Sequence, residues 1–142
     1  MFRIRENEIA DALTTTDIWE IMLKEIPPIA AEYFIGGADE LTTLKANVLA
    51  FKQILLAPRG AIKFKKLDTS SNIFGHNLSL PFFIAPIGSL RTAWPMGDAV
   101  ASQVAGEFGT AMTLSTLSQT PMEDVSKASA GPNWFQLYLC GG

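Results

Sequence analysis

The sequence predicts an α/β fold in which N-terminal helices and a β-hairpin precede a parallel sheet covered by helices. Before about residue 60, apolar residues recur at helical spacing. From residue 81 on, short runs that are apolar on both faces alternate with helical stretches. Runs of this kind, spaced by helices, are typical of parallel strands covered on both sides.

Three helices are expected in the first part of the chain. They are predicted at residues 16–26, 28–35 and 41–56. Thr16 or Asp17 is the expected N-cap of the first. Proline at the first helical position opens the second helix, and the Gly36-Gly37 pair suits a left-handed C-cap at its end.

The apolar period changes to two after residue 60. In "AIKFKKLD" (61–68), Ile62 and Phe64 alternate with lysines, which predicts a strand. "SNIFGHNLSL" (71–80) has a Gly75-His76 turn between short apolar pieces and predicts a hairpin. His76 is the one histidine of the chain, and its place in a polar turn is typical of an exposed residue.

Strands and helices alternate from residue 81. Strands are predicted at 82–86, 111–115 and 133–139, with a helix at 97–108 between the first two. Thr120-Pro121-Met122-Glu123 has the pattern of a capping box with proline at the first helical position, which predicts the start of the next helix.

Ligands of parallel sheets bind at the carboxyl ends of the strands, in barrels and open sheets alike. At these ends lie Pro86, Ile87, Gly88, Ser115, Gln136 and Tyr138. Gly88 lets a flat ligand approach the backbone, and the Gln136 amide needs a polar partner inside an apolar strand. Tyr138 shares the face of Gln136.

Each of these residues has an ordinary structural alternative. Pro86 to Gly88 also suits a strand-to-loop turn, Ser115 a local backbone partner, Gln136 a cap on a neighbouring strand, and Tyr138 the core. The residues taken alone therefore predict only a polar ligand site in part of an α/β protein.

Composition excludes several classes of function. The net charge is -3, and the Lys63, Lys65, Lys66 cluster is too short for a nucleic-acid surface. Cys140 is the only cysteine, so an internal disulfide and a cysteine-based metal site are excluded, as expected in a reducing compartment such as the cytoplasm. We expect no secretory signal at the start and no membrane-spanning helix.

Five stretches, in order and at matching spacing, carry a family resemblance: "YFIGGADELTTLKANVLAF", "LAPRG", "LPFFIAPIG", "GTAMTLSTLS" and "FQLY". From about Ile26 to Tyr138 the chain resembles the N-terminal part of the FMN-dependent L-2-hydroxy acid oxidases and dehydrogenases, the family of glycolate oxidase, lactate monooxygenase and flavocytochrome b2. The "YFIGGADE" block argues against the alternative of an FMN-dependent isopentenyl diphosphate isomerase.

The resemblance implies a TIM (β/α)8 barrel truncated after three strands. Residues 1–142 then form a partial domain, with a helical segment at 1–60, a hairpin at 61–80 and the first barrel strands at 81–142. The implied activity is oxidation of a small L-2-hydroxy acid, such as lactate or glycolate, to the 2-oxo acid. FMN is the implied cofactor, and the full-length form is expected to be a homo-oligomer.

The resemblance also implies roles for individual residues. Tyr33 matches the tyrosine that binds the substrate carboxylate, and Tyr138 matches the tyrosine near the substrate hydroxyl, which makes it the catalytic candidate. FMN binding is implied for residues at three strand ends: Pro86, Ile87, Gly88, Ser115 and Gln136.

The chain also departs from the family pattern. Ile87 stands where many members have threonine, and Leu117 stands where glycolate oxidases have tryptophan, which leaves the substrate open. The histidine base and carboxylate-binding arginine of later strands have no counterpart here. We therefore expect a fragment of a longer enzyme, poorly stable alone. The alternative is a non-catalytic truncated product or interaction partner.

Overall fold

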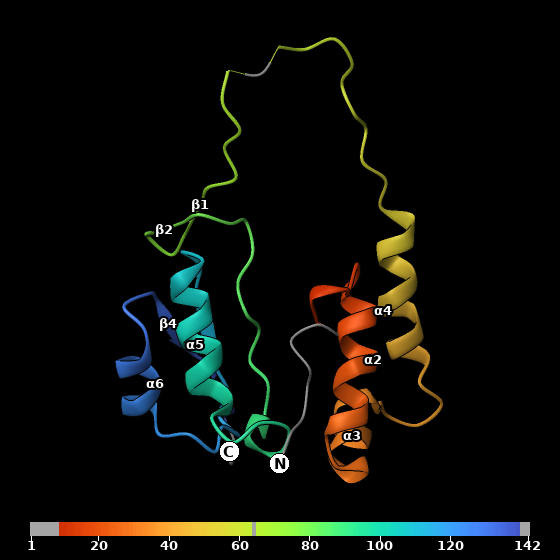
Figure 1. Cartoon of the computed structure of the whole chain (residues 1–142), viewed down its shortest axis with the longest axis vertical. Helices are drawn as coiled ribbons and strands as arrows, with labels where there is room; N and C mark the ends of the chain where they lie inside the picture. The colour runs from red at the N-terminus through yellow and green to blue at the C-terminus, as the bar shows by residue number, and fades with distance from the viewer. Residues whose placement is uncertain (1–8, 64, 140–142) are drawn as a thin grey trace. The chain divides into compact units, whose positions relative to one another are not determined.

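The computed structural model describes residues 9–63 and 65–139, which fall into two compact units divided between Lys66 and Leu67 (Figure 1). Each unit is described by itself. The predictions that concern Phe64 and Cys140 lie outside the described residues.

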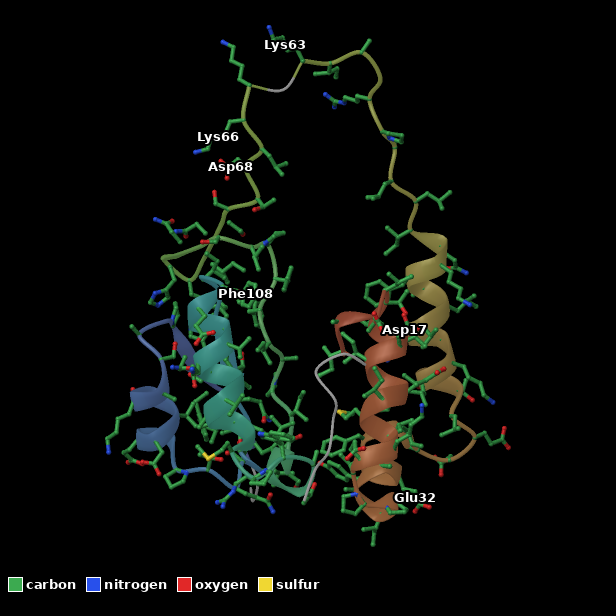
Figure 2. The ribbon with its side chains drawn as sticks, in the orientation of Figure 1. Asp17, Glu32, Lys63, Lys66, Asp68 and Phe108 are labelled. Atoms are coloured by element: carbon green, nitrogen blue, oxygen red, sulfur yellow. The ribbon has the colours of Figure 1, made fainter. Side chains whose placement is uncertain are left out.

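The first unit contains the three expected helices: α2 (Thr15–Glu25), α3 (Pro28–Ile35) and α4 (Thr42–Gln53). The predicted N-cap of α2 is wrong, because Thr14 takes that position. The Thr14 hydroxyl accepts from the Asp17 amide at 3.2 Å, and the Asp17 carboxylate accepts from the Thr14 amide at 2.8 Å. The Thr14 hydrogen bonds hold the pKa of Asp17 below its ordinary value of 3.8. Figure 2 shows Asp17 in α2.

The helix α3 ends differently from the prediction. Pro28 opens it as expected, but Gly36 at its end is extended, with φ of −69°, and is not left-handed. Glycine is still needed there for space, since a Cβ would lie 2.7 Å from the Glu32 carbonyl oxygen.

The predicted strand at 61–68 is wrong for the residues that the structure describes. Lys63, Lys65 and Lys66 are exposed and belong to no strand; Figure 2 shows Lys63 and Lys66 on this segment. Alternating sequence is insufficient here, because a strand needs a partner for its backbone N–H and C=O groups.

The predicted hairpin is confirmed as β1 (Ser71–Ile73) paired antiparallel with β2 (His76–Leu78). Its turn lies one residue earlier than predicted, at Phe74 and Gly75, whose φ values are +50° and +81°. Two consecutive left-handed residues are typical of the type I′ turn, whose twist suits a hairpin. His76 is exposed and begins β2.

Two parallel strands form the sheet of the second unit. β3 (Met112–Leu114) pairs with β4 (Asn133–Phe135) in the register Thr113 to Trp134. The predicted first strand at 82–86 is reduced to one parallel bridge, in which the Ile84 amide donates to the Ala111 carbonyl at 3.0 Å and the Ile84 carbonyl accepts from the Thr113 amide at 2.9 Å. The mixed α/β fold with parallel pairing is confirmed.

Helices connect these strands. A short 3-10 turn, η1 (Leu90–Thr92), and α5 (Gly97–Glu107) precede β3, and α6 (Met122–Ala128) precedes β4. The four residues Ala105, Met112, Leu114 and Val125 form a buried cluster that joins α5, α6 and β3, with Ile84 packed against it.

The predicted capping box at residues 120–123 is wrong. Helix α6 begins at Met122 after Pro121, with no side-chain cap. The Thr120 hydroxyl donates to Asp98 Oδ2 at 3.1 Å instead, and the Ser118 hydroxyl donates to the same oxygen at 2.8 Å. Asp98 lies in the first turn of α5 and is fully buried. The Thr120 hydroxyl therefore donates to a carboxyl group that is distant in the sequence, and it does not cap the first turn of α6 as the local pattern predicts.

Candidate flavin-binding edge of the parallel sheet

The two faces of the sheet have different partners. Met112 and Leu114 face the helices, where they form the buried cluster with Val125. Alternation places Thr113, Trp134 and the residues in step with them on the opposite face. There the Trp134 ring packs edge-to-face on Phe83, with ring centroids 4.9 Å apart, and on Phe74 at 5.3 Å.

The carboxyl end of this opposite face brings together two predicted site residues. If the register of β3 and β4 is continued, Ser115 pairs with Gln136. The backbone N–H of Gln136 donates to the Leu114 carbonyl at 2.8 Å. The Ser115 hydroxyl donates to Gln136 Oε1 at 3.3 Å and accepts from the Leu117 amide at 3.1 Å. Ser115 is only 4% exposed, and its hydroxyl bonds to two groups of the protein itself.

The orientation of the Gln136 side chain is set by its neighbours. The Thr116 backbone N–H donates to Gln136 Oε1 at 3.2 Å. Because an N–H can only donate, the amide oxygen must face Thr116, and the amide nitrogen Nε2 faces away. Nε2 donates to no residue that the structure describes. The end of the sheet therefore presents Nε2 as a hydrogen-bond donor whose orientation is set by Thr116 and Ser115.

Thr116 was not predicted as a site residue, yet it ties the end of β4 to the loop after β3. Its hydroxyl donates to the Gln136 carbonyl and accepts from the Tyr138 amide at 3.1 Å. The sequence signal that could have identified it is a hydroxyl residue directly after the strand, beside the predicted Ser115.

The first strand end meets the second through the backbone. The Ser89 amide donates to the Leu117 carbonyl at 3.1 Å, so the segment after Gly88 and the loop after β3 lie side by side. Pro86 and Ile87 are exposed and Gly88 is partly exposed. Gly88 has no Cβ, so its backbone is not shielded by a side chain of its own.

The two tyrosines of the prediction are in different units. Tyr138 follows the sheet and is 53% exposed, while Tyr33 lies in α3 of the first unit and is 54% exposed. The ring of Tyr33 packs edge-to-face on Phe34, with centroids 5.1 Å apart. The structure brings Ser115, Gln136 and the backbone of Tyr138 together.

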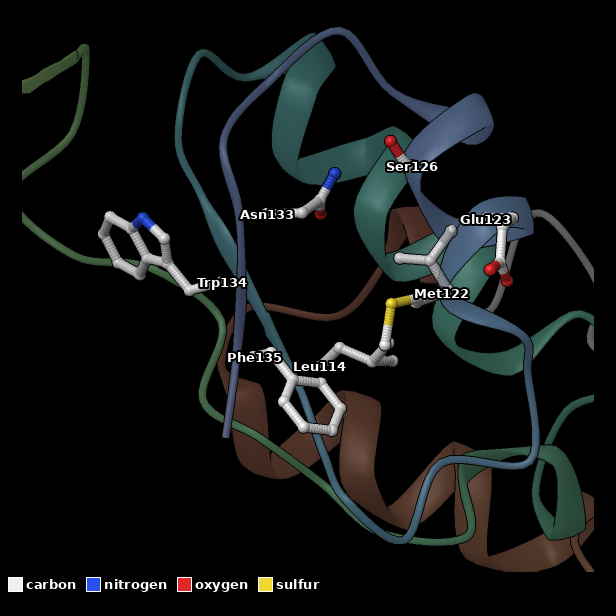
Figure 3. Close-up of a pocket in the computed structure, with 8 residues that line it drawn as sticks. Leu114, Met122, Glu123, Ser126, Asn133, Trp134 and Phe135 are labelled. Carbon is white, nitrogen blue, oxygen red and sulfur yellow. The ribbon is translucent and has the colours of Figure 1, made fainter. Parts of the chain in front are cut away.

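An apolar groove lies on the helix side of the sheet, away from these residues. Figure 3 shows Met122, Leu114 and Phe135 around it, while Trp134 points to the opposite face. None of the residues that line it is a predicted site residue. Phe135 is exposed there, on the side of α6 and β4 where the described chain supplies no further element.

Cationic and histidine side chains of the described chain are not gathered at the strand ends. Arg91 follows the first strand end, but its guanidinium donates to the backbone carbonyls of Pro95, at 3.2 Å, and Gln119, at 3.0 Å. His76 lies in the hairpin, 6.4 Å from Trp134 between ring centroids. Among residues 9–63 and 65–139, no group of three His, Cys, Asp or Glu could hold a metal ion.

Residues 22–141 match the family of FMN-dependent dehydrogenases, which covers most of the chain. The chain belongs to this family. Its resemblance to FMN-dependent 2-hydroxy acid oxidases is thereby confirmed, and FMN is the cofactor of the family.

Similar proteins agree with this assignment. A 2-hydroxyacid oxidase of Dictyostelium discoideum is 36% identical over 136 residues, which cover 95% of this chain and 35% of the relative. An L-lactate dehydrogenase of Haemophilus influenzae (strain PittEE) is 36% identical over 126 residues, 89% of this chain and 33% of the relative. The crystal structure of mandelate oxidase has a TM-score of 0.85 at 27% identity, covering 89% of this chain and 37% of that chain.

The chain thus spans about a third of the length of the relatives that it matches. In the part of the chain that the structure describes, no helix is long and apolar enough to cross a membrane.

Proposed function

We propose that this chain forms the flavin-facing edge, and part of the substrate-facing wall, of an FMN-dependent enzyme that oxidises an L-2-hydroxy acid to the 2-oxo acid. The observation that carries the proposal is the Gln136 amide, held by Thr116 and Ser115 with its Nε2 donor free. A flavin ring offers carbonyl and ring-nitrogen acceptors at its polar edge, and a fixed N–H donor suits them.

The chain's own residues have distinct roles in this proposal. Gln136 donates to the polar edge of the isoalloxazine ring, and the backbone from Pro86 to Gly88 lies against the ring. Ser115 contacts the flavin with its remaining lone pair and orients Gln136. FMN supplies the two-electron acceptor chemistry when bound.

Tyr33 and Tyr138 are proposed to bind the substrate. The Tyr33 hydroxyl donates to the carboxylate, and the Tyr138 hydroxyl donates to the oxygen on the α-carbon. Both side chains are about half exposed, which leaves part of each accessible to a small ligand. A histidine base and an arginine from later strands complete the site in the longer enzyme.

The substrate is a small 2-hydroxy acid. Among the relatives, one is named for 2-hydroxy acids, one for L-lactate and others for glycolate. Leu117 is exposed next to the Ser115 end of the sheet. A branched apolar side chain there favours a substrate with a methyl or larger group over glycolate.

The finer architecture belongs to the same proposal. The bridge at Ile84, β3 and β4 are the first three strands of a TIM barrel, with domain segments at 1–60, 61–80 and 81–142. The exposed Phe135 beside α6 supports this, since the next helix and strand of a barrel would cover it. The enzyme is proposed to be a cytoplasmic homo-oligomer.

The second candidate is a non-catalytic truncated product or interaction partner. The observation that favours it is the place of His76, which lies in the hairpin beside Trp134 and away from the strand ends. Proton removal from the α-carbon then has no histidine base at the strand ends that the structure describes.

The test begins with the gene, read past the codon for Gly142, followed by purification of its full-length product. We expect a later histidine and arginine in frame, about one FMN per chain, and bleaching of the flavin by L-lactate without oxygen. The Gln136→Leu variant should bind FMN about 10- to 100-fold more weakly, because it loses the donor. Gln103→Leu, at an exposed position of α5, is the matched control and should bind FMN as tightly as the wild type.

A colourless product with no affinity for added FMN would contradict the cofactor assignment. FMN binding without bleaching by any 2-hydroxy acid would favour the non-catalytic candidate.

A further inference from the structure

The loop after β3 is fastened to the end of β4 by one side chain. Beyond Leu114 and Phe135 the strands no longer form a regular ladder. The Thr116 hydroxyl donates to the Gln136 carbonyl and accepts from the Tyr138 amide at 3.1 Å. It thus makes the two hydrogen bonds that the backbone N–H and C=O of Thr116 would make if β3 continued beside β4.

The same residue orients the Gln136 side chain through its backbone. The Thr116 N–H donates to Gln136 Oε1 at 3.2 Å, which turns Nε2 outward. If the loop detached from β4, this N–H would move away and the amide could rotate. Thr116 therefore joins the loop to β4 through its hydroxyl and sets the orientation of the Gln136 side-chain amide through its backbone N–H.

We propose that Thr116 is a positioning residue that holds the Gln136 amide and the Tyr138 backbone in place for flavin and substrate. This inference rests on the proposed function for its ligand, though the positioning itself concerns only the chain. Thr116 acts through Gln136 and Tyr138 and need not touch the flavin. Serine preserves the hydroxyl, while valine keeps the branched shape and removes both hydrogen bonds.

The opposite end of β3 supplies a matched control. The Thr110 hydroxyl donates to the Phe82 carbonyl, again from a threonine beside β3 to the backbone of a neighbouring strand segment. Thr110 is buried, and it precedes β3 at the end away from Gln136. Thr110→Val therefore removes a comparable hydrogen bond from the same sheet without touching the proposed site.

The experiment compares T116V, T116S and T110V in the full-length gene product that contains these residues. We expect T116V to raise the Kd for FMN about tenfold, the loss expected for one good hydrogen bond, and to shift the visible absorption bands of bound flavin. T116S should stay within about twofold of the wild type, and T110V should lower the melting temperature without changing Kd or spectrum. If T116V does not fold, T116A, which adds no new bulk, replaces it.

A ligand-free readout separates this inference from the proposed function. In T116V the Tyr138 amide should exchange with solvent about tenfold faster, and the NMR resonances of the Gln136 side-chain amide should shift. If the wild-type protein binds no FMN, the proposed cofactor role fails, and these two signals still decide the positioning role. Equal effects of T116V and T110V on Tyr138 exchange and on Gln136 would overturn it.

Discussion

The helical unit and the α/β unit differ in how they bury apolar side chains. Among the described residues of the first unit, the buried apolar side chains are Ile26, Ala30 and Ala31, and α2 and α4 bury none. The second unit closes a cluster between α5, α6 and β3 that includes Met112 at 0% exposure and Val125 at 1%.

The two units differ in whether local signals or long-range contacts define their structure. Helices α2 to α4 form from local signals, namely the capping box at Thr14, the proline start at Pro28 and helical spacing. The second unit depends on contacts between residues far apart in the chain, such as Asp98 with Ser118 and Thr120. Its stability should therefore respond more strongly to single substitutions.

The largest expected effect is the truncation of Met112 in β3. Met112→Ala should destabilise the chain by about 2–5 kcal/mol, because it leaves a cavity in a closed core. Val48→Ala in α4, where the side chain is 58% exposed, should change the free energy of unfolding by no more than about 0.5 kcal/mol. Urea unfolding measures both, and similar losses would contradict the contrast between the units.

The buried carboxylate of Asp98 comes next. Asp98→Ala should cost about 1–3 kcal/mol, because the hydroxyls of Ser118 and Thr120 lose their acceptor inside the protein. Asp124→Ala is the control: its carboxylate lies on the surface of α6, 3.8 Å from Lys127 Nζ, and exposed pairs contribute about 0–1 kcal/mol. Urea unfolding of both variants tests this, and a neutral Asp98→Ala would show that the hydroxyls find other acceptors.

A smaller effect is expected at Gly109, which directly follows the C-cap of α5. Its φ is +66°, and a Cβ would lie 2.4 Å from Ser79 Oγ. Gly109→Ala should cost about 1–2 kcal/mol for the left-handed backbone alone. Gly60→Ala in the first unit should be close to neutral, because nothing lies within 4 Å of the added Cβ. Equal melting temperatures for the two variants would be the contrary result.

The smallest effect concerns the local capping box of α2. The pKa of Asp17 is lowered from 3.8 in the folded state by its hydrogen bonds to Thr14, so the cap contributes stability above the unfolded pKa. That contribution should be lost as the pH falls from about 4 through the lowered pKa. Amide exchange at the start of α2, corrected for the intrinsic pH effect, should speed up in this range, and Asp17→Asn should remove the dependence.

The strand ends that hold Ser115 and Gln136 could be predicted from the sequence, and alternation along the predicted strand at 133–139 predicts one face for Gln136 and Tyr138. The register that pairs Ser115 with Gln136 comes only from the structure, where β4 ends at Phe135. Thr116 was missed, because its role depends on a carbonyl and an amide about 20 residues away. The roles of Tyr33 and Tyr138 toward a ligand remain predictions.

The three helices of the first unit, the hairpin and the parallel α/β order could be predicted from the sequence alone, because they follow from spacing, proline and glycine within a few residues. Tertiary contacts decide that the described residues of 61–68 form no strand, that Thr120 binds Asp98 rather than capping α6, and that the Gln136 side chain presents its nitrogen. Such groups can form hydrogen bonds with more than one partner. A strand backbone, a hydroxyl or an amide bonds to the partner that the fold brings closest, and the residues next to it in the sequence do not identify that partner.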